Sequence, residues 1–448
     1  MKIKQFEDKP LAHYSYAIVS EGEMALVDPS RNPLPYYAYA EENKARIVAV
    51  FETHPHADFV SSHLQIHKET GATIYTSKQV GADYPHKTFD DGDELQLGAV
   101  RFSSLNTPGH SPDGISILAK SSDNEYAIFT GDTLFIGDVG RPDLREKAGN
   151  IRAKREELAK MMYHTIREKF SDLPDRTLVY PAHGAGSLCG KNLSSDASST
   201  LGNERMGNWA FRDQSETEFV EQILKEQPFI PAYFGYDVSI NKRGAENLGR
   251  SMARVPLLIG ADNVEDDILV VDTRAKEEFK RNHLPGSVNI MATGEDDKFE
   301  TWLGTLVQPG EPFYLVMQSA GDKDYLLQRI AKIGYEQQMK GVVTLSEVTH
   351  SKSAGFDYEA FKGHPDNFTI LDIRNASEVR EGRYFSNSIN IPLPELRAAL
   401  DEIPRDKPIV VHCAGGYRSA AGSSIVDGAV DEVPVYDLSD RVNEFQKK

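Results

Sequence analysis

Short apolar runs separated by polar turns fill the first half of the chain. Residues 12–19 and 23–29 are two such runs on either side of a glycine-bearing turn, which predicts a β-hairpin. Residues 61–70 instead place apolar side chains at helical spacing. This pattern predicts a β-rich first domain with a few helices over residues 1–240, and the polar, glycine-bearing residues 241–250 indicate a linker.

The second half contains an internal repeat of about 100 residues. An apolar run that ends in Asp-x-Arg at residues 270–274 recurs at 370–374, and a Ser-Val/Ile-Asn-Ile block at 286–290 recurs at 387–391. In each copy these strand-like blocks alternate with helical patterns, at a spacing typical of parallel-sheet α/β units. The sequence therefore predicts two copies of a small α/β domain with a parallel sheet.

Length and composition fit this division. The chain has 448 residues, too many for one ordinary domain, and we assign residues 1–240, 241–345 and 346–448 to three domains. Its two cysteines cannot make a disulfide framework and indicate free thiols in a reducing compartment. A formal net charge of −18 argues against nucleic-acid and anionic-membrane partners. The N-terminus does not resemble a secretion signal and no apolar run is long enough to span a membrane, so the expected location is the cytoplasm.

A run of metal-competent side chains follows the apolar residues 47–51. His54-Pro55-His56-Ala57-Asp58-Phe59 packs three such side chains into one turn. Farther along the chain, His110, Asp132 and His183 each follow a β-like run, so the loops that carry them are expected to converge on one pocket. The apolar ring that ends the first run cannot ligate a cation, which favours one metal ion over two.

The order H-x-H-x-D, His, Asp, His resembles the metallo-β-lactamase superfold, a four-layer αββα sandwich, and within it the persulfide dioxygenase branch. Metal-dependent hydrolases with this run usually carry a second His where this chain has Phe59. The commoner dioxygenase run also keeps a His there, so Phe59 is a departure from it that leaves the three expected ligands intact. The resemblance implies that His54, His110 and Asp132 hold one Fe(II) per subunit, with coordination positions left for a persulfide sulfur and O₂. Three further residues would orient these ligands or move protons: His56, Asp58 and His183. For Asp58 and His183, the remnant of a two-metal site is an equally good interpretation.

Other polar residues near this pocket have two interpretations each. Arg141, in the Gly-Arg-Pro-Asp run, either steers an anionic substrate and stabilises the pocket or forms a structural salt bridge with Asp143 or Asp138. His63 and His67, four residues apart, are predicted to lie on a helix surface rather than to bind metal. The resemblance places three residues along the cleft for an anionic low-molecular-weight thiol carrier: Lys191, Arg205 and Asn208.

The C-terminal copy of the repeat carries a reactive-cysteine loop. Cys413 ends an apolar strand, four small or turn residues follow, and Arg418 opens a helix. Backbone N–H groups of such a loop and the helix N-terminus favour the thiolate, so Cys413 is predicted to be a nucleophile that carries persulfide. Arg418 is expected to bind sulfite or thiosulfate oxygens or to brace the loop. In the other copy Gln318 stands at the cysteine position, and an amide cannot carry a persulfide. The second thiol, Cys189, is either an accessory thiol near the metal pocket or a buried bystander.

The cysteine loop, with Asp372 and Arg374 upstream, resembles a rhodanese, and nearly the whole chain resembles persulfide dioxygenase–sulfurtransferase fusions of bacterial sulfide detoxification. The resemblance implies that a thiol persulfide and O₂ give sulfite and the parent thiol. The rhodanese would transfer a second persulfide sulfur to sulfite and make thiosulfate. A thioester hydrolase of the type-II glyoxalase kind fused to rhodaneses, and a non-catalytic persulfide carrier, are the alternatives. The identity of the thiol and the direction of the rhodanese reaction stay open, and a homo-oligomer is expected.

Overall fold

The computed structural model describes residues 1–144, 154–345 and 350–446 and divides into two compact units. Unit 1 comprises Met1–Ser251 and Ile330–Gly334, and unit 2 comprises Met252–Arg329 and Tyr335–Lys448. The domain boundary predicted between residues 345 and 346 lies at the edge of a stretch outside the described residues. Among the described residues, no helix has the length and apolar content that crossing a bilayer requires.

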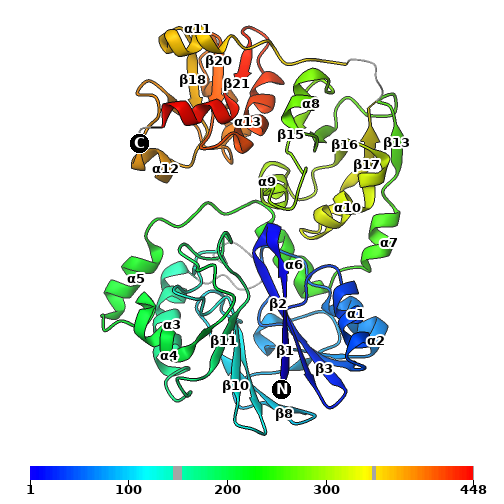
Figure 1. The fold of residues 1–448 in the computed structure, drawn as a ribbon, viewed down its shortest axis with the longest axis vertical. Helices are drawn as coiled ribbons and strands as arrows, with labels where there is room; N and C mark the ends of the chain where they lie inside the picture. Colours follow the sequence, from blue (N-terminus) through cyan, green and yellow to red (C-terminus); the bar gives the residue numbers. More distant parts are fainter. Residues whose placement is uncertain (145–153, 346–349, 447–448) are drawn as a thin grey trace. The chain divides into compact units, whose positions relative to one another are not determined.

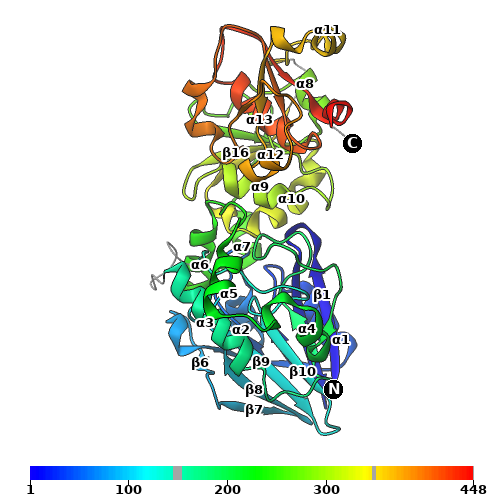
Figure 2. The same cartoon turned by 90° about the vertical axis from the view of Figure 1, so that its left-hand side faces the viewer.

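Two six-stranded sheets form the centre of unit 1. The first runs in chain order and comprises β1 (Lys2–Asp8), β2 (His13–Ser20), β3 (Glu23–Val27), β4 (Arg46–Phe51), β5 (Thr73–Thr76) and β6 (Lys87–Thr88). The second runs in the order β12-β11-β10-β9-β8-β7 and comprises β7 (Glu94–Leu97), β8 (Val100–Asn106), β9 (Ile115–Ser121), β10 (Tyr126–Gly131), β11 (Leu178–Pro181) and β12 (Ser199–Thr200). Figure 2 shows β7 to β10 of the second sheet. The two sheets share one buried core cluster, which contains Phe51 of the first and Phe102 and Phe129 of the second.

Helices cover the outer face of each sheet of unit 1. On the first sheet, α1 (Leu34–Glu42) and α2 (His63–Thr70) bury Tyr36 and Ile66. On the second sheet, α3 (Arg155–Glu168) and α5 (Glu216–Leu224) bury Met162 and Phe219. The remaining helices are α4 (Leu201–Gly207), α6 (Phe234–Arg243) and α7 (Leu248–Ala253). This order of helices, sheet, sheet and helices, visible in Figure 1, confirms the predicted αββα sandwich.

Local predictions in unit 1 have mixed outcomes. The hairpin is confirmed as the antiparallel pair β2 and β3, and the helix is confirmed as α2. The linker predicted at residues 241–250 is wrong at its start, because Asn241 is buried in α6. Its side-chain amide donates to the carbonyl oxygens of His56 and Phe59, and its Oδ1 accepts from the backbone N–H of Ser61. Asn241 thus fixes the loop after β4. The polar residues next to it in the sequence gave no indication of this role.

Unit 2 contains two parallel sheets, which confirms the two predicted α/β copies. The first runs in the order β13-β17-β16-β14-β15 and comprises β13 (Leu257–Ile259), β14 (Leu269–Asp272), β15 (Val288–Asn289), β16 (Phe313–Met317) and β17 (Met339–Thr344). The second runs in the order β19-β18-β20-β21 and comprises β18 (Thr369–Asp372), β19 (Ile389–Asn390), β20 (Ile409–His412) and β21 (Val435–Asp437). The helices are α8 (Lys276–Arg281), α9 (Phe299–Leu306), α10 (Lys323–Ala331), α11 (Tyr358–Gly363), α12 (Ala376–Glu381) and α13 (Tyr417–Asp427).

The repeat extends to individual hydrogen bonds. In the first copy, Arg274 pairs with Asp272, and the Asn289 amide donates to the carbonyl oxygens of both residues. In the second copy, Arg374 pairs with Asp372, and the Asn390 amide donates in the same way. The buried ion pair fixes the end of one strand in each copy, and the Asn amide ties that end to the parallel neighbouring strand, which explains why both copies contain the Asp-x-Arg and Asn-Ile blocks.

Candidate functional site

Three loops of unit 1 bring His54, His110 and Asp132 together. They follow β4, β8 and β10, and all three residues are buried. The Nε2 atoms of His54 and His110 lie 3.7 Å and 3.5 Å from Asp132 Oδ2, and the three ligand atoms lie within 4.8 Å of one another. The sequence-predicted ligand set therefore forms one compact group of two imidazoles and one carboxylate.

The chemistry of this group fits a metal ion. No described residue donates a hydrogen bond to Asp132 Oδ2, although that atom is buried. Burial acts to raise the pKa of Asp132, but the neighbouring His183, and then His110 and His54, lower it well below its ordinary range. A buried carboxylate oxygen between two imidazole nitrogens suits a divalent cation of the Fe(II) or Zn²⁺ kind.

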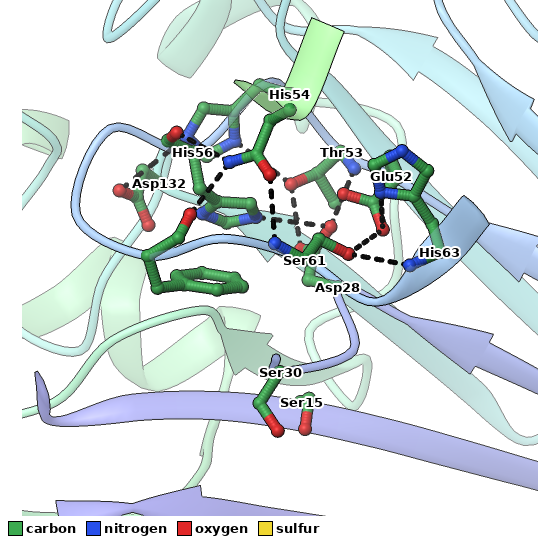
Figure 3. A network of polar contacts seen from close by, with 12 residues as sticks. Ser15, Asp28, Ser30, Glu52, Thr53, His54, His56, Ser61, His63 and Asp132 are labelled. Atoms are coloured by element: carbon green, nitrogen blue, oxygen red, sulfur yellow. Dashed lines mark hydrogen bonds and ion pairs between the residues drawn. The ribbon is translucent and has the colours of Figure 1, made fainter. Parts of the chain in front are cut away.

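Asp28 and Thr53 orient the first imidazole, and sequence reasoning missed both. Figure 3 shows them in one network with His54. The Thr53 hydroxyl donates to Asp28 Oδ2 at 2.8 Å and lies 3.0 Å from His54 Nδ1. Because the single hydroxyl proton goes to the carboxylate, the Thr53 oxygen must accept from His54 Nδ1–H. This fixes the tautomer with its lone pair on Nε2, the nitrogen that faces Asp132. Gly131, with φ of +53°, allows this approach, since a Cβ there would lie 2.5 Å from Thr53 Oγ1.

His56 points away from the three ligand atoms. Its Nε2 lies 3.3 Å from Asp28 Oδ1, and it groups with Asp28 and Glu52 rather than with His54. Glu52 accepts from the Ser61 hydroxyl at 2.7 Å. Burial, and next the charge of Asp28, raise the pKa of Glu52 well above its ordinary range. Glu52 therefore tends to stay protonated, and Glu52 and Asp28 together carry less negative charge than two ionised carboxylates would. Figure 3 shows this second group beside His54 and Asp132 of the first.

His63 belongs to the same network, and the prediction that it lies on a helix surface is wrong. It is buried at the start of α2, with Nδ1 3.5 Å from Glu52 Oε1 and its ring 4.4 Å from the Tyr84 ring. Burial, followed by the charges of Arg31 and His56, lowers the pKa of His63 to about 3. Helical spacing alone did not distinguish the inner from the outer face, because His63 and the partly exposed His67 are a helical turn apart.

His183 spans the two carboxylates of the pocket. Its Nε2 lies 2.7 Å from Asp58 Oδ2, and its Nδ1 lies 2.7 Å from Asp132 Oδ1. Burial acts to lower the pKa of His183, but Asp132 and Asp58 raise it well above its ordinary range. The cationic imidazole therefore holds these two carboxylates together.

Cys189, Phe59 and His13 complete this side of the pocket. The Cys189 thiol groups with Asp58 and His183, and burial followed by the charge of Asp58 raises the pKa of the thiol well above its ordinary range. The Phe59 ring packs against the His13 ring, tilted by 35°, at 3.8 Å between centroids. Burial, and then His183, lower the pKa of His13 well below its ordinary range, so this imidazole is neutral. His13 lies in a hairpin strand far from the histidine run, and nothing in the sequence marked it.

Three of the residues predicted to steer or bind substrate make side-chain contacts within the fold: Arg141, Arg205 and Asn208. The Arg141 guanidinium forms two 2.6 Å bonds with Asp143 and donates to backbone carbonyl oxygens, with only 1% of the residue exposed, which favours the salt-bridge alternative. Arg205 pairs with Asp175. The Asn208 amide is buried and donates to the Asp138 carbonyl oxygen. The Lys191 backbone N–H donates to Asp138, and burial, followed by Arg141, lowers the pKa of its half-buried amine.

The Cys413 loop has the features of an anion cradle. It joins β20 to α13, and the Gly416 N–H donates to Cys413 Sγ at 3.1 Å. Gly416 has φ of +99°, and a Cβ there would lie 2.8 Å from the backbone nitrogen of Asp440, so only glycine fits. Arg418 forms two 2.7 Å bonds with Glu378, so the bracing alternative describes this structure.

The corresponding loop of the first copy is filled by its own carboxylate. Asp322 accepts from both the backbone N–H and the hydroxyl of Ser319. Gln318 stands at the cysteine position and lines a cavity of about 320 Å³. Because the Asp322 carboxylate accepts from the Ser319 N–H, that N–H is already used within the loop. The first copy therefore lacks both the nucleophile and a free anion cradle.

Comparisons with known proteins agree with the folds described for both halves of the chain. The profile of the metallo-beta-lactamase superfamily matches residues 8–183, and that of the rhodanese-like domain matches residues 258–344 and 358–447. A solved metallo-beta-lactamase from Staphylococcus aureus subsp. aureus COL is 31% identical, with a TM-score of 0.68, and the match covers 77% of this chain and 99% of that one.

Two curated relatives carry different activities in their names. A probable hydroxyacylglutathione hydrolase of Schizosaccharomyces pombe is 34% identical over 178 residues, which is 38% of this chain and 63% of that protein. The mitochondrial persulfide dioxygenase ETHE1 of Homo sapiens is 31% identical over 164 residues, 36% of this chain and 59% of that protein. The chain thus spans less than two thirds of either curated relative. With the solved relative matched over almost its full length, the chain belongs to the metallo-beta-lactamase superfamily and continues into two rhodanese-like domains.

Proposed function

We propose that this chain is an Fe(II)-dependent persulfide dioxygenase joined to a thiosulfate-forming sulfurtransferase. The observation that carries the proposal is the orientation of His56. It lies 3.3 Å from Asp28, so the pocket offers the two-histidine, one-carboxylate set of a non-haem iron enzyme rather than three histidines. Phe59 further removes a nitrogen donor that two-metal hydrolases of this kind usually have.

The first reaction would be RSSH + O₂ + H₂O → RSH + H₂SO₃, in which the terminal persulfide sulfur is oxidised and O₂ is reduced. Bound Fe(II) would supply the electrons that activate dioxygen, which Zn²⁺ cannot do. His54, His110 and Asp132 would hold that ion, and Thr53 keeps the His54 lone pair directed at it. His183 lies 2.7 Å from Asp132 Oδ1 and, with its pKa raised by Asp132 and Asp58, would hold a proton there.

The second reaction would use Cys413. Its thiolate attacks the terminal sulfur of a second RSSH, so that an S–S bond forms on Cys413, the original S–S bond breaks and RSH leaves. Sulfite then attacks the outer sulfur, which gives thiosulfate and regenerates the thiolate. The Gly416 N–H, 3.1 Å from Sγ, stabilises the negative charge before the attack. Glu378 fixes Arg418 beside this loop, so the guanidinium supports the anionic site from a set position.

A thioester hydrolase is the second candidate, because a relative at 34% identity is named a probable hydroxyacylglutathione hydrolase. The test is to reconstitute the full chain anaerobically with Fe(II), and then to measure oxygen uptake across a panel of low-molecular-weight persulfides and hydrolysis of S-lactoylglutathione. Oxygen uptake with sulfite formation supports the proposal. Thioester hydrolysis without oxygen uptake would replace it by the hydrolase.

A Cys413→Ser variant separates the two reactions. It should still consume oxygen, accumulate sulfite and make no thiosulfate, because the two sites lie in different units. If Cys413→Ser loses both oxygen uptake and thiosulfate formation, the chain is a persulfide carrier instead. Gln318→Ser is the matched control, since it changes the corresponding position of the other copy and should leave both reactions unchanged.

A further inference from the structure

We infer that the segment Ile330–Gly334 positions the loop that follows β4 and, through that loop, the metal pocket. The segment is part of unit 1, although the chain on either side of it, Met252–Arg329 and Tyr335–Lys448, belongs to unit 2. In sequence it therefore lies inside the first rhodanese-like copy, within the matched residues 258–344. The inference rests on the metal-binding part of the proposed function and is independent of the persulfide chemistry.

The backbone of this segment accepts a hydrogen bond from the loop. The N–H of Val60 donates to the carbonyl oxygen of Lys332 at 2.7 Å, and Val60 is buried. On either side of Val60, the Phe59 carbonyl oxygen accepts from the Asn241 amide, and the Ser61 N–H donates to Asn241 Oδ1. Three consecutive loop residues are thus bound by groups from two distant parts of the chain. Because a buried N–H group needs an acceptor, the Lys332 carbonyl oxygen fixes the loop at Val60.

Gly334 brings the segment close enough to pack on the loop. Its φ is +68°, and a Cβ there would lie 2.5 Å from Ile240 Cδ1 and 3.2 Å from Val60 Cγ2. Val60 and Ile240 belong to one buried cluster, against which Tyr236 packs, and the Tyr236 hydroxyl donates to the Gly334 carbonyl oxygen at 3.4 Å. A larger residue at position 334 would displace these side chains, so both the backbone conformation and the contact favour glycine.

Lys332 anchors the segment to the first sheet. Its amine lies 2.8 Å from the carboxylate of Asp8, the last residue of β1, and the two side chains are only 20% and 15% exposed. Partial burial reduces the screening of this ion pair by solvent and salt. The flanking Ile330 and Ile333 side chains are fully buried. The segment is therefore held by an ion pair and by apolar packing as well as by the backbone bond to Val60.

The loop fixed in this way carries Asp58, two residues before Val60. Asp58 Oδ2 lies 2.7 Å from His183 Nε2, and His183 Nδ1 lies 2.7 Å from Asp132 Oδ1. A shift of Val60 would therefore reach the Asp132 carboxylate through one imidazole. Because Asp132 is one of the three residues proposed to hold the metal ion, a change in the segment should alter metal affinity without changing a ligand. The copy without a reactive cysteine thus supplies a support for the metal pocket.

Gly334→Ala tests the inference in the full chain. The added methyl group should displace Val60 and weaken Fe(II) binding by about tenfold, as measured by anaerobic competition with a chromogenic chelator. Gly310→Ala is the matched control, because Gly310 also has a positive φ, of +84°, but a Cβ there meets no atom of the described residues within 4 Å. The control imposes the same kind of backbone strain without the contact, so it should bind Fe(II) as the unsubstituted chain does. Equal affinities of the two variants would overturn the inference.

Hydrogen exchange gives a readout that needs no metal ion. In the metal-free chain, Gly334→Ala should raise the exchange rate of the Val60 amide by about tenfold or more, because its acceptor moves. Gly310→Ala should leave that rate unchanged. A Gly334→Ala protein in which this amide exchanges as slowly as in the unsubstituted chain would refute the positioning role.

Lys332 provides a milder pair of variants. Lys332→Met removes the ion pair with Asp8, whereas Lys332→Arg keeps a cation there. The Met variant should show faster Val60 exchange and weaker Fe(II) binding, and the Arg variant should restore both. Identical behaviour of the two variants would contradict the anchoring of the segment.

This inference and the proposed function can fail separately. A chain that shows the expected exchange rates but takes up no oxygen refutes the proposed function alone. Oxygen uptake by the unsubstituted chain, together with unchanged Val60 exchange in Gly334→Ala, refutes the inference alone.

Discussion

Replacing Thr53 by Val tests whether the proposed iron ligands depend on the Asp28–Thr53–His54 chain of hydrogen bonds. Valine keeps the shape of the side chain but removes the hydroxyl that links His54 Nδ1, at 3.0 Å, to Asp28 Oδ2, at 2.8 Å. Asp28 stays in place, because it still accepts from the backbone N–H of residue 53 at 2.7 Å. The substitution therefore acts on the tautomer and the direction of the His54 ring.

The expected loss follows from what the hydroxyl does. Removing a partner that orients a metal-binding histidine typically costs about 10–100-fold in metal affinity, which corresponds to roughly 1.4–2.8 kcal/mol. The variant also buries a His54 N–H without this acceptor, which lowers the free energy of unfolding by about 1–3 kcal/mol. We expect Fe(II) affinity to fall by that factor and the metal-free melting temperature to fall as well.

The assay is an anaerobic competition titration of Fe(II) between the full chain and a chromogenic chelator. Thr177→Val is the matched control, because Thr177 is fully buried in the same unit and its hydroxyl makes no hydrogen bond with any described residue. The control should bind iron as the unsubstituted chain does. If a folded Thr53→Val protein binds Fe(II) with unchanged affinity, the orienting role of this hydroxyl is refuted.

Three further predictions concern other parts of the chain. Tyr417→Phe removes a 2.7 Å hydrogen bond to the Met291 carbonyl oxygen, worth about 0.5–1.5 kcal/mol. Because this bond supports the loop that holds Cys413, steady-state assays should show thiosulfate formation slowed by about two- to tenfold, with oxygen uptake unchanged. Arg141→Met leaves Asp143 without its bidentate partner and should destabilise unit 1 by about 3–5 kcal/mol in calorimetry; an unchanged transition would contradict the bracing role. His63 has a folded pKa of about 3, below the unfolded value of about 6.5. The unfolded state therefore binds the proton first, and His63 reduces stability as pH falls from about 6.5 to 3, by at most about 1.4 kcal/mol per pH unit. A His63→Gln protein should show a shallower loss of melting temperature over that range.

Much of the metal centre could be predicted because strand ends converge. His54, His110 and Asp132 are far apart in sequence, but each follows an apolar run, and those runs are strands whose ends meet at one edge of the sandwich. The repeat in the second half could be predicted for a similar reason. Asp272 and Asp372 each end a strand, and each pairs with the Arg two residues later. The same contact therefore requires the same residues in both copies.

The supporting residues could not be predicted, because their roles depend on distant contacts. Asp28 follows β3 in a run that looked only like one half of a hairpin, and its partner Thr53 is 25 residues away. Asn241 reaches the loop of Phe59 across 182 residues. Arg141 was ambiguous because a guanidinium serves a substrate or a salt bridge equally well, and only its burial decides between the two. One sequence records which side chains are present, whereas these roles depend on which backbone groups need a donor or an acceptor.

The copy without a cysteine supports the loop and helix that hold Cys413 in unit 2. The hydroxyl of Tyr417, which lies between Gly416 and Arg418 in the reactive loop, donates to the backbone of Met291 in that copy. The Ser424 hydroxyl of α13 accepts from the backbone N–H of Asn289. Both contacts come from the segment around β15, so the first copy supports the helix and loop that hold Cys413. Because these bonds use backbone groups of the first copy, the support does not depend on which side chain stands at position 318.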